Sequence, residues 1–565
     1  MILDALDLPD GHVLDADICV VGGGAVGISL ALELRGSGLD VLLLESGGED
    51  EEEDTQALYA GKVVDERMHS PPDRYRQRRF GGSSTIWGGR CMPYDPIDFE
   101  MRDYMPHSGW PIGLDAIQPY YPQANRLCEV GRFDYTIETS FDQPSRPMIK
   151  GFESTHFTTD TLERFSCPTD FHIRYHERLA SAGIRVLLHA NVTGLHLHAD
   201  GKAVERLTVK TLADKKGAGK TGAGKTGSSK TLGVRAKRVV LATGGLEIPR
   251  LLLANRDVHA NGIGNAHDVV GRYYMCHVAG TIGTLHFSGG GDAVWNGYDV
   301  SDEGVYCRRR LALRPETQRA ERIGNFVARL HFPRITDPRH NHAVLSALYF
   351  AKPIISYEYR KRLTEDGPFS WATWLHHLRN VVLGWPDAAG FAWHMLRDRK
   401  LAARKFPSII IRSRSNLYSL DFHAEQAPNP ESRIRLGSDT DPLGMPRLEV
   451  DWRYTRGDVE TAERSLALLA ADIQASGVGR FDYDPASVEY EMTRYGAYGG
   501  HHIGTARMGT DPKESVVDTD CRVHGMSNLY IAGSAVFPTS SQANPTLTAV
   551  ALALRLARHL KEHIA

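Results

Sequence analysis

The sequence has few features of secreted, zinc-binding or membrane-spanning proteins. Its seven cysteines include no Cys-x-x-Cys pair and have no regular spacing, so neither a disulfide framework nor a zinc site is expected. Residues 1–7 are acidic and lack a cationic region before an apolar run, unlike a secretory signal. No run of 18 apolar residues predicts a transmembrane helix. A reducing, cytoplasmic setting is therefore favoured.

The sequence also lacks an excess of basic residues. The formal net charge is −3, whereas binding a nucleic acid requires a concentrated basic face. Hydrophobic residues at 42% and charged residues at 24% are ordinary for a soluble globular protein. A length of 565 residues favours two joined domains.

A nucleotide-binding fingerprint lies near the N-terminus. An apolar strand at residues 16–21 leads into Gly22, Gly24 and Gly27, which fit Gly-x-Gly-x-x-Gly and precede a helical pattern. The first glycine permits a tight turn, the second lets a pyrophosphate approach the backbone, and the third allows close packing of helix and strand. Glu45 ends the next predicted strand, where its carboxylate can accept hydrogen bonds from ribose hydroxyls. The fingerprint predicts a dinucleotide site without choosing between FAD and NAD.

A second glycine-rich loop, at residues 80–90, suits a cofactor with an extended ring system as well as a pyrophosphate. Together with other segments it resembles the glucose-methanol-choline (GMC) oxidoreductases, a family of FAD-dependent alcohol oxidases and dehydrogenases. The resemblance covers essentially the whole chain. Its other segments are Ala242-Thr243-Gly244-Gly245, residues 270–275, residues 428–433, residues 500–509 and Asn544-Pro545-Thr546.

The resemblance implies an α/β fold with a Rossmann-like FAD-binding domain and an inserted α+β substrate domain that carries an antiparallel sheet. The expected FAD domain comprises residues 14–100, 185–270 and 500–565, and the expected substrate domain comprises residues 101–184 and 271–499. FAD is the implied cofactor, and no metal is expected. The residues expected to bind FAD are Gly22, Gly24, Gly27, Glu45, Gly81, Gly82, Ser83, Trp87, Ala242, Gly244, Gly533, Ser534, Pro545 and Thr546.

The loop around Trp87 is most similar to a pyranose-oxidase-like branch of the family. Some members of this branch attach FAD covalently through a histidine that immediately precedes the tryptophan. Here the position is Ile86, which has no nucleophilic atom. The sequence therefore predicts noncovalent FAD.

Residues 500–509 and Asn544-Pro545-Thr546, called here the C-terminal block, supply the side chains that alcohol oxidation needs. An imidazole can take the hydroxyl proton near neutral pH while a hydride leaves for flavin N5, and a second polar group can orient the alcohol. Neighbouring side chains of an extended segment point to opposite faces, so only one of His501 and His502 can face the flavin. The family motif places its catalytic histidine three residues before the glycine equivalent to Gly504, which is His501. Asn544 corresponds to the second catalytic position.

A predicted helix follows Asn544 and contributes a charge effect. Pro545 suits the first turn of a helix, because its missing N–H costs nothing there. The helix N-terminus carries a partial positive charge, which suits the negative charge that accumulates near N1 and O2 of reduced flavin. His502, Tyr498 and Gln426 are weaker candidates for contact with substrate, as are Tyr495, His277 and Glu425; for His502 a packed position beside His501 is the favoured interpretation.

Two further segments need an interpretation. Residues 219–226 match the phosphate-loop pattern Gly-x-x-x-x-Gly-Lys-Thr, but a working loop needs a buried strand before it and a helix after it. Residues 204–212 and 232–238 instead predict two amphipathic strands, which makes residues 214–231 a flexible hairpin loop. The Trp- and Leu-rich residues 370–401 predict helix, interpreted as core or subunit interface, with a lid or a membrane surface as alternatives.

The sequence therefore predicts FAD-dependent oxidation of an alcohol CH–OH group, with His501 as base and oxygen or another electron acceptor as partner. The resemblance favours a sugar, glycoside or polyol as substrate. A lyase of the same family, oxidation of a non-sugar alcohol, and a nucleotide-hydrolysing or regulatory protein that uses residues 219–226 stay open as alternatives. The substrate, the oligomeric state and the choice between oxidase and dehydrogenase are not predicted.

Overall fold

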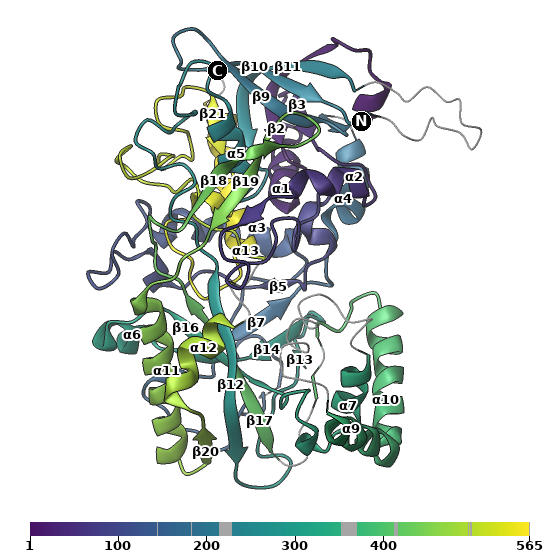
Figure 1. The fold of residues 1–565 in the computed structure, drawn as a ribbon, viewed down its shortest axis with the longest axis vertical. Coiled ribbons are helices and arrows are strands. Elements are labelled where there is room, and N and C mark those ends of the chain that lie inside the picture. The colour runs from purple at the N-terminus through teal and green to yellow at the C-terminus, as the bar shows by residue number, and fades with distance from the viewer. Residues whose placement is uncertain are drawn as a thin grey trace, which may run out of the picture.

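The computed structural model describes residues 1–143, 145–181, 183–213, 229–351, 370–408, 410–411, 416–494, 497 and 500–563. The chain forms two halves, each built around its own large sheet (Figure 1). The half that contains both termini is called here the cofactor half, and the other the substrate half.

The cofactor half is built on an eight-stranded sheet with the strand order β1-β8-β3-β2-β11-β10-β9, in which β21 also pairs with β11. The strands β1, β8, β3, β2, β11 and β21 run parallel to one another, whereas β10 runs antiparallel to its two neighbours, β11 and β9. All four residues of β3 are buried, as expected where helices and loops cover both faces of a parallel sheet. The bounds are β1 (Ile2–Asp4), β2 (Val13–Val21), β3 (Val41–Leu44), β8 (Ile184–Leu188), β9 (Asn191–Leu197), β10 (Val204–Lys210), β11 (Thr231–Leu241) and β21 (Leu529–Ile531).

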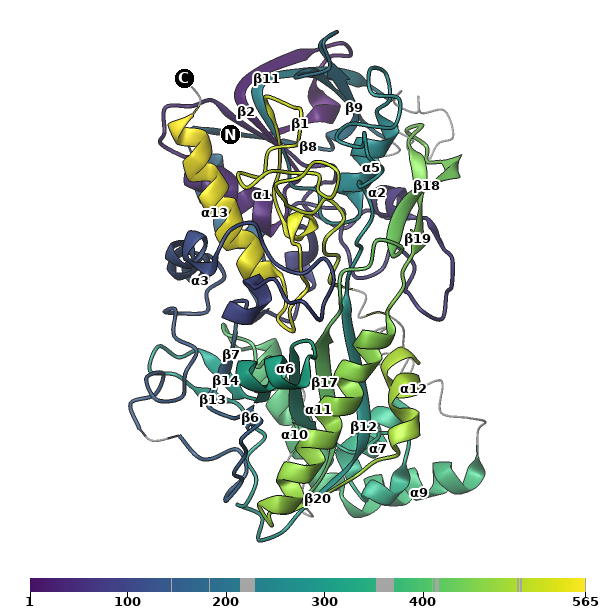
Figure 2. The same cartoon turned by 90° about the vertical axis from the view of Figure 1, so that its left-hand side faces the viewer.

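Two helices that are far apart in the sequence pack against each other beside this sheet. They are α1 (Ala25–Leu34) and α13 (Thr546–Glu562), seen together in Figure 2. The apolar positions of α13 are fully buried, so its packing rather than its helix propensity stabilises it. The helices α3 (Tyr121–Leu127) and α4 (Phe171–Ala180) extend this layer, and α5 (Glu247–Ala254) follows β11.

The substrate half is built on a six-stranded antiparallel sheet with the order β20-β12-β17-β16-β15-β6. The helix α11 (Arg456–Ala475) packs on β16 and β17, and begins with a capping box between Thr455 and Asp458. The short α12 (Val488–Thr493) lies against β12. The strand bounds are β6 (Phe157–Thr158), β12 (His277–Phe287), β15 (Leu311–Leu313), β16 (Phe326–His331), β17 (Leu417–Glu425) and β20 (Gly479–Asp482).

Two small sheets and several short helices complete the fold. One sheet has the order β13-β14-β7-β5 and the other β18-β19-β4. Their bounds are β4 (Lys62–Val63), β5 (Arg90–Cys91), β7 (Leu162–Phe165), β13 (Asp299–Val300), β14 (Tyr306–Arg309), β18 (Arg433–Thr440) and β19 (Pro446–Asp451). The remaining helices include α2 (Glu53–Gln56), α6 (Pro315–Glu321), α7 (Ala343–Phe350), α9 (Trp371–Leu383) and α10 (Trp385–Met395).

The predicted α/β fold with an inserted antiparallel sheet is confirmed. Three elements of the cofactor half lie outside the predicted cofactor segments: β1 pairs with β8 at the sheet edge, α3 packs on α13, and α4 packs on α1 and β8. Residues 204–212 and 232–238 form the expected antiparallel pair, with Lys210 opposite Thr231. The strand predicted at residues 232–238 continues to Leu241 as β11, which pairs with β2 from Gly233 to Leu241. Thr231 therefore belongs to a strand, and residues 214–228 of the predicted loop lie outside the described residues.

The Trp- and Leu-rich stretch is helical, as predicted, and forms α9 and α10. Its interpretation as core is wrong, because Val382, Trp385 and Trp393 are each at least 60% exposed. Within the described residues, no helix is both long enough and apolar enough to cross a bilayer.

Candidate active site

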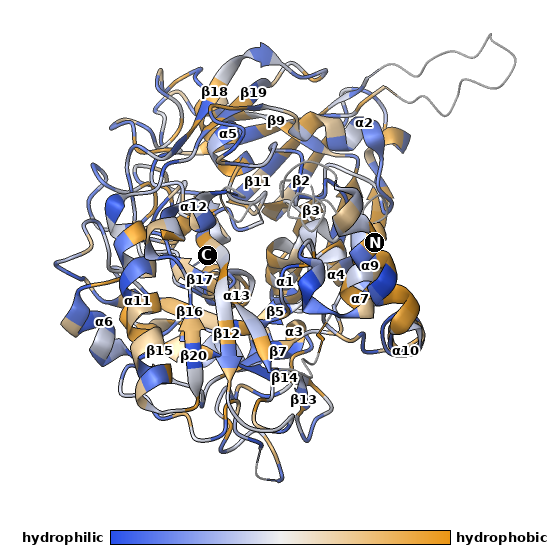
Figure 3. Cartoon of the chain, turned by 60° about the horizontal axis from the view of Figure 1, so that its bottom comes forward, coloured by the Kyte–Doolittle hydropathy of each residue, from blue (hydrophilic) through white to orange (hydrophobic). Residues whose placement is uncertain are grey.

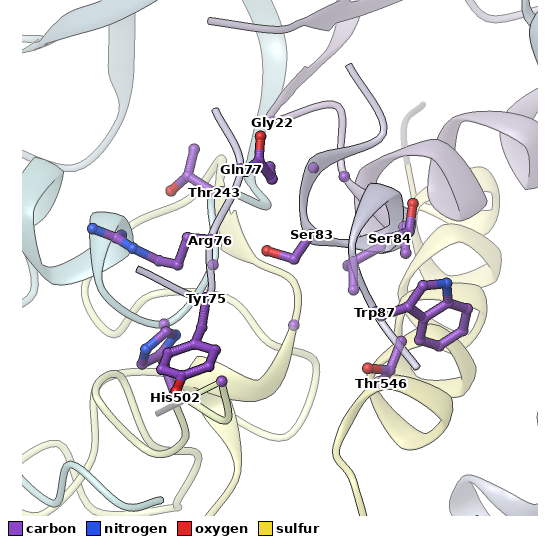
Figure 4. A pocket seen from close by; sticks show the side chains of 18 of the residues that line it. Gly22, Tyr75, Arg76, Gln77, Ser83, Ser84, Trp87, Thr243, His502 and Thr546 are labelled. Carbon is purple, nitrogen blue, oxygen red and sulfur yellow. The ribbon is translucent and has the colours of Figure 1, made fainter. Parts of the chain in front are cut away.

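A cavity of about 830 Å³ is lined by residues of both halves. Figure 4 draws 18 of its lining residues and labels ten, which are contributed by the β2–α1 turn, the segment 75–77, the glycine-rich loop at 80–90, the end of β11, the C-terminal block and α13. Most residues predicted to bind the cofactor lie on this lining. They are Gly22, Gly24, Glu45, Gly82, Ser83, Trp87, Ala242, Gly244, Gly533, Ser534, Pro545 and Thr546.

Two of the three fingerprint glycines, Gly22 and Gly27, leave no room for a side chain. Gly22 has a φ of +113°, and a Cβ there would lie 2.6 Å from the carbonyl oxygen of Ala242. A Cβ on Gly27 would lie 1.9 Å from the carbonyl oxygen of Gly22. Gly27 is buried inside α1 and does not line the cavity, so its place matches the predicted packing function rather than a cofactor contact.

Glu45 stabilises this turn. Its Oε2 accepts a hydrogen bond from the backbone N–H of Gly23 at 2.8 Å, and its Oε1 accepts one from the N–H of Gly47 at 2.9 Å. The carboxylate is buried and also lines the cavity. Glu45 therefore fixes the backbone on which a ribose would rest, a structural function that the spacing alone does not indicate.

The second glycine-rich loop lies directly on the first. The N–H of Gly81 donates to the carbonyl oxygen of Gly23 at 2.8 Å, which places Gly81 behind the lining rather than on it. Ser83 is exposed on the lining, and the indole N–H of Trp87 donates to the carbonyl oxygen of Thr169 at 2.9 Å. Ile86, at the position of the covalent histidine in some relatives, also lines the cavity.

The N-termini of two helices meet the same cavity. Gly24 and Ala25 line it at the start of α1, and Asn544, Pro545 and Thr546 line it at the start of α13. The first backbone N–H groups of a helix have no partner within the helix and carry a partial positive charge. The cavity is therefore suited to anionic groups at two places.

His501 stands next to a second buried histidine. Met275 and Ile503 form an antiparallel bridge, and this register sets His277 opposite His501. The two Nδ1 atoms are 2.7 Å apart, within hydrogen-bond distance. His277 is fully buried and does not line the cavity, whereas His501 is half-buried and does.

The surroundings of His501 keep its imidazole neutral. Burial lowers the pKa of His501 well below its usual range, and the charges of His277, Arg90 and His502 lower it further. Burial also lowers the pKa of His277 to about 4. A third buried imidazole, that of His423 on β17, stacks 6.1 Å from His277, and its pKa is also well below the usual value.

His502 faces a different set of partners. Its ring stacks on Tyr274, with ring centroids 6.1 Å apart, and its carbonyl oxygen accepts a hydrogen bond from Ser534 at 2.8 Å. It is 9% exposed and lines the cavity. His502 is therefore packed beside His501, as the sequence favoured, and it also lies at the cavity wall.

Gln426 and Glu425, two weaker candidates for substrate contact, are not on the lining. Oε1 of Gln426 accepts hydrogen bonds from the N–H of Cys276 and the indole of Trp452, and its Nε2 donates to Arg453, so its amide is used in packing. Glu425 is buried and forms a bidentate pair with Arg102 at 2.7 and 2.6 Å. Tyr498, like Tyr495, lies outside the described residues.

Several lining residues were missed by the sequence reasoning. Oε1 of Gln77 and Oγ1 of Thr243 are buried without a hydrogen-bond partner in the described part of the chain, and both residues line the cavity. Such atoms fit a bound polar cofactor that supplies the missing hydrogen bonds. The cluster of four arginines at 74–79, in a chain of nearly balanced charge, was an available signal for this wall.

One group of possible metal ligands lies away from the cavity lining. Among the described residues, Glu49, His172 and His176 bring three ligand atoms within 4.8 Å of one another. Oε1 of Glu49 lies 3.7 Å from Nε2 of His172 and 3.3 Å from Nε2 of His176. None of the three lines the cavity.

Comparison with known proteins identifies the class and then the family. A family model described as FAD dependent oxidoreductase matches residues 17–344, more than half of the chain. A second model, described as GMC oxidoreductase, matches residues 428–553, which contain His501 and Asn544. The chain is an FAD-dependent oxidoreductase, and it belongs to the GMC oxidoreductase family.

Characterised relatives span nearly the whole chain. The 6'''-hydroxyparomomycin C oxidase of Streptomyces lividus is 24% identical over 97% of this chain and 92% of its own length. The fructose dehydrogenase large subunit of Gluconobacter japonicus is 25% identical over 97% and 98%. Pyranose 2-oxidase of Tricholoma matsutake is 31% identical over 178 residues, 30% of each chain, which supports the predicted likeness to that branch.

The fold has a solved counterpart. The crystal structure of pyridoxine 4-oxidase from Mesorbium loti aligns with a TM-score of 0.52 at 17% identity, covering 97% of this chain and 99% of the other. This likeness concerns the fold alone.

Proposed function

We propose that the protein oxidises a CH–OH group of a sugar, glycoside or polyol by hydride transfer to bound FAD, with His501 as the base. The observation that carries the proposal is the convergence, in one cavity, of the glycine turn, the start of α13 with Asn544, and a histidine whose pKa lies below its usual range. The names of the relatives support a sugar-like substrate, because they include oxidases or dehydrogenases of an aminoglycoside, fructose and a pyranose.

The cofactor half would hold FAD. Gly22, Gly24 and the start of α1 suit the pyrophosphate, and Glu45 suits the ribose hydroxyls. The orphaned Oε1 of Gln77 and Oγ1 of Thr243 would gain partners on binding. When bound, FAD supplies the hydride acceptor, its N5 atom.

His501 would remove the hydroxyl proton of the substrate. A neutral imidazole can accept a proton, and the lowered pKa of His501 keeps the ring neutral at physiological pH. Because Nδ1 faces Nδ1 of His277 at 2.7 Å, we assign proton transfer to Nε2. For Nε2 to accept this proton, Nδ1 of the neutral His501 ring must carry the hydrogen and donate it to Nδ1 of His277. This hydrogen bond fixes the ring orientation, which makes His277 a positioning residue.

Asn544 would orient the substrate. Its side-chain amide stands beside the first turn of α13, where it can hold the alcohol oxygen and direct the C–H bond toward N5. The N–H groups at the start of α13 would stabilise the negative charge that the cofactor gains on reduction.

We propose that FAD is held without a covalent bond. Ile86 offers no nucleophile at the position used by some relatives, and among the described residues no cysteine lines the cavity. Precipitation with acid should release the flavin into the supernatant. Flavin that stays with the precipitated protein would contradict this assignment.

An anaerobic substrate screen tests the proposed function. The purified holoenzyme should lose its oxidised flavin absorbance with at least one polyol, sugar, aminosugar or glycoside, and readmitted air or an added acceptor dye should then restore it. Recovery in air identifies an oxidase, and recovery only with the dye identifies a dehydrogenase. Flavin that no alcohol reduces would overturn the proposal and favour a non-redox lyase.

A further inference from the structure

The helix α9 has its polar and apolar faces reversed with respect to an ordinary surface helix. Its two buried residues are His377 and Asn380. Asn380 donates hydrogen bonds to the carbonyl oxygen of Pro338 at 2.8 Å and to Oγ of Ser346 at 3.2 Å, and His377 bonds the same Oγ at 3.0 Å. The face turned toward α7 and the segment before it therefore buries two polar side chains, and Trp374 packs on Phe350 of α7 beside them.

The opposite face of α9 is apolar and lies in solvent. Leu375, Leu378 and Val382 follow one another at helical spacing and are 56%, 38% and 60% exposed. The following helix continues the pattern, since Trp385 and Trp393 are 65% and 61% exposed and no residue of α10 is buried. Figure 3 shows the hydrophobic colouring of these helices at the edge of the molecule. We call this surface the α9–α10 face.

An exposed apolar area of this kind marks a binding surface, because isolated exposed leucines are ordinary but a continuous stripe is not. The inward hydrogen bonds of His377 and Asn380 also fix α9 in this orientation, so turning the stripe inward would leave buried polar groups unpaired. The stripe is therefore a stable feature of the fold.

The charges around the α9–α10 face show which partner fits it. Residues 370–405 contain six Lys or Arg and two Asp, a local charge of +4 in a chain of net charge −3. Arg379, Arg397, Lys400 and Lys405 are exposed beside the apolar residues. A second copy docked by a two-fold axis would bring +4 against +4, whereas an anionic surface complements this charge.

We propose that the α9–α10 face binds the interface of an anionic lipid bilayer. Trp and Leu on one side with Lys and Arg around them are the composition of helices that lie in the headgroup region. At 13 and 11 residues, α9 and α10 are too short to span a bilayer, so the contact is one of surface insertion. Met395 and Arg399, directly after the exposed Trp393, line the active-site cavity, so binding would hold this wall of the cavity at the membrane.

Flotation of the full-length holoenzyme with lipid vesicles tests the proposal independently of catalysis. Vesicles of phosphatidylcholine and phosphatidylglycerol in equal amounts should bind the protein at least ten times more strongly than pure phosphatidylcholine vesicles. Added salt should weaken the binding, and the tryptophan emission should shift to shorter wavelength on binding. Absence of binding, or equal binding to both vesicle types, overturns the proposal.

Matched substitutions locate the surface. The triple variant Leu375→Gln, Leu378→Gln, Val382→Gln should lose at least tenfold in vesicle binding, while Met101→Gln, Ile173→Gln, Tyr490→Gln, at exposed positions elsewhere, should bind like the unchanged protein. Bound flavin and circular dichroism check that both fold. Arg379→Gln, Lys400→Gln should weaken binding to anionic vesicles several-fold and flatten its salt dependence.

Two results of these variants would refute the assignment. An equal loss in both triple variants would show that the α9–α10 face is not the site. A dimer in solution that the first triple variant dissociates, without vesicle binding by the unchanged protein, would assign the face to a second copy of the chain instead.

Discussion

The two walls of the cavity are built in different ways. On the cofactor wall, the β2–α1 turn consists of backbone: Gly22, Gly24 and the start of α1 follow one another within a few residues, and a Cβ on Gly22 would collide with the carbonyl oxygen of Ala242, directly after β11. The catalytic wall consists of side chains from distant segments, with His501 held by His277 across 224 positions of the chain. A local motif can specify the β2–α1 turn, whereas the contact of His501 with His277 exists only after the two halves have folded together.

The difference extends to electrostatics. On the cofactor wall, the N-termini of α1 and α13 present partial positive charges that do not change with pH. On the catalytic wall, burial of three imidazoles lowers the pKa of each one. Changes to the cofactor wall should therefore act on assembly, and changes to the catalytic wall should act on rate and on pH dependence.

The largest expected effect comes from filling the glycine turn. Gly27→Ala would place a methyl group 1.9 Å from the carbonyl oxygen of Gly22, which neither strand nor helix can vacate. The variant should purify without flavin or remain insoluble, as measured by the ratio of flavin to protein absorbance. Gly390→Ala in α10, where the added Cβ meets nothing within 4 Å, is the matched control and should keep its flavin. It should gain roughly 0.5–1 kcal/mol of stability from helix propensity. A flavin-loaded Gly27→Ala enzyme would contradict the packing argument.

Removing His277, the partner of the proposed base His501, should slow flavin reduction without loss of the cofactor. His277→Asn should retain FAD and reduce the rate of anaerobic flavin reduction about 10- to 100-fold, a part of the roughly 10²–10⁴-fold that general-base catalysis contributes. Loss of the neighbouring imidazole should also raise the pKa of His501, because the charge of His277 lowers it. Rates and a pH profile identical to those of the unchanged enzyme would show that His277 only packs.

The pH dependence of flavin reduction follows from the lowered pKa of His501. The pKa of His501 lies below the usual histidine value of about 6.5, so the base is neutral throughout the neutral range. The rate of flavin reduction should therefore be constant between pH 8 and pH 6.5. It should fall only below pH 6.5, as the imidazole of His501 becomes protonated. Stopped-flow reduction between pH 5 and 8 measures this limb. A midpoint at or above 7 would mean that the ring is not desolvated as described.

The smallest expected effect is that of the low-complexity segment. Replacing residues 214–228 by Asn-Gly should leave flavin content and activity nearly unchanged, since β10 and β11 pair up to Lys210 and Thr231 without them. The flavin-to-protein ratio and the rate of anaerobic flavin reduction check this. Loss of nucleotide binding or of activity in this variant would revive the phosphate-loop interpretation of residues 219–226.

Predictability from sequence follows the same division between backbone and side chains. The β2–α1–β3 unit and the strands around residues 214–228 were predicted, because local periodicity and glycine spacing determine them. The inserted antiparallel sheet was predicted from the resemblance to the family. The contact of His277 with His501 was not, since it depends on the register set by Met275 and Ile503. Gln426 was a weaker candidate for substrate contact, yet Cys276 and Trp452 bind its amide, a contact that its own sequence neighbourhood does not indicate.

The orientation of α9 could not be predicted from the sequence pattern either, because it too depends on contacts with another segment. A stripe of Leu and Val at helical spacing ordinarily predicts a buried face. Only the hydrogen bonds of His377 and Asn380 in the structure show that the other face is the inner one. The orientation of α9 is set by its polar partners, Pro338 and Ser346, which another segment contributes.

The most direct test of the account is anaerobic stopped-flow reduction of His501→Ala by a substrate found in the screen, compared with His502→Gln. His501→Ala should bind FAD normally and reduce it about 10²–10⁴ times more slowly than the unchanged enzyme. His502→Gln should show a much smaller loss, because the ring of His502 stacks on Tyr274, whereas it is His501 that pairs with His277. Flavin reduction at the normal rate in His501→Ala would contradict the assignment of the catalytic base.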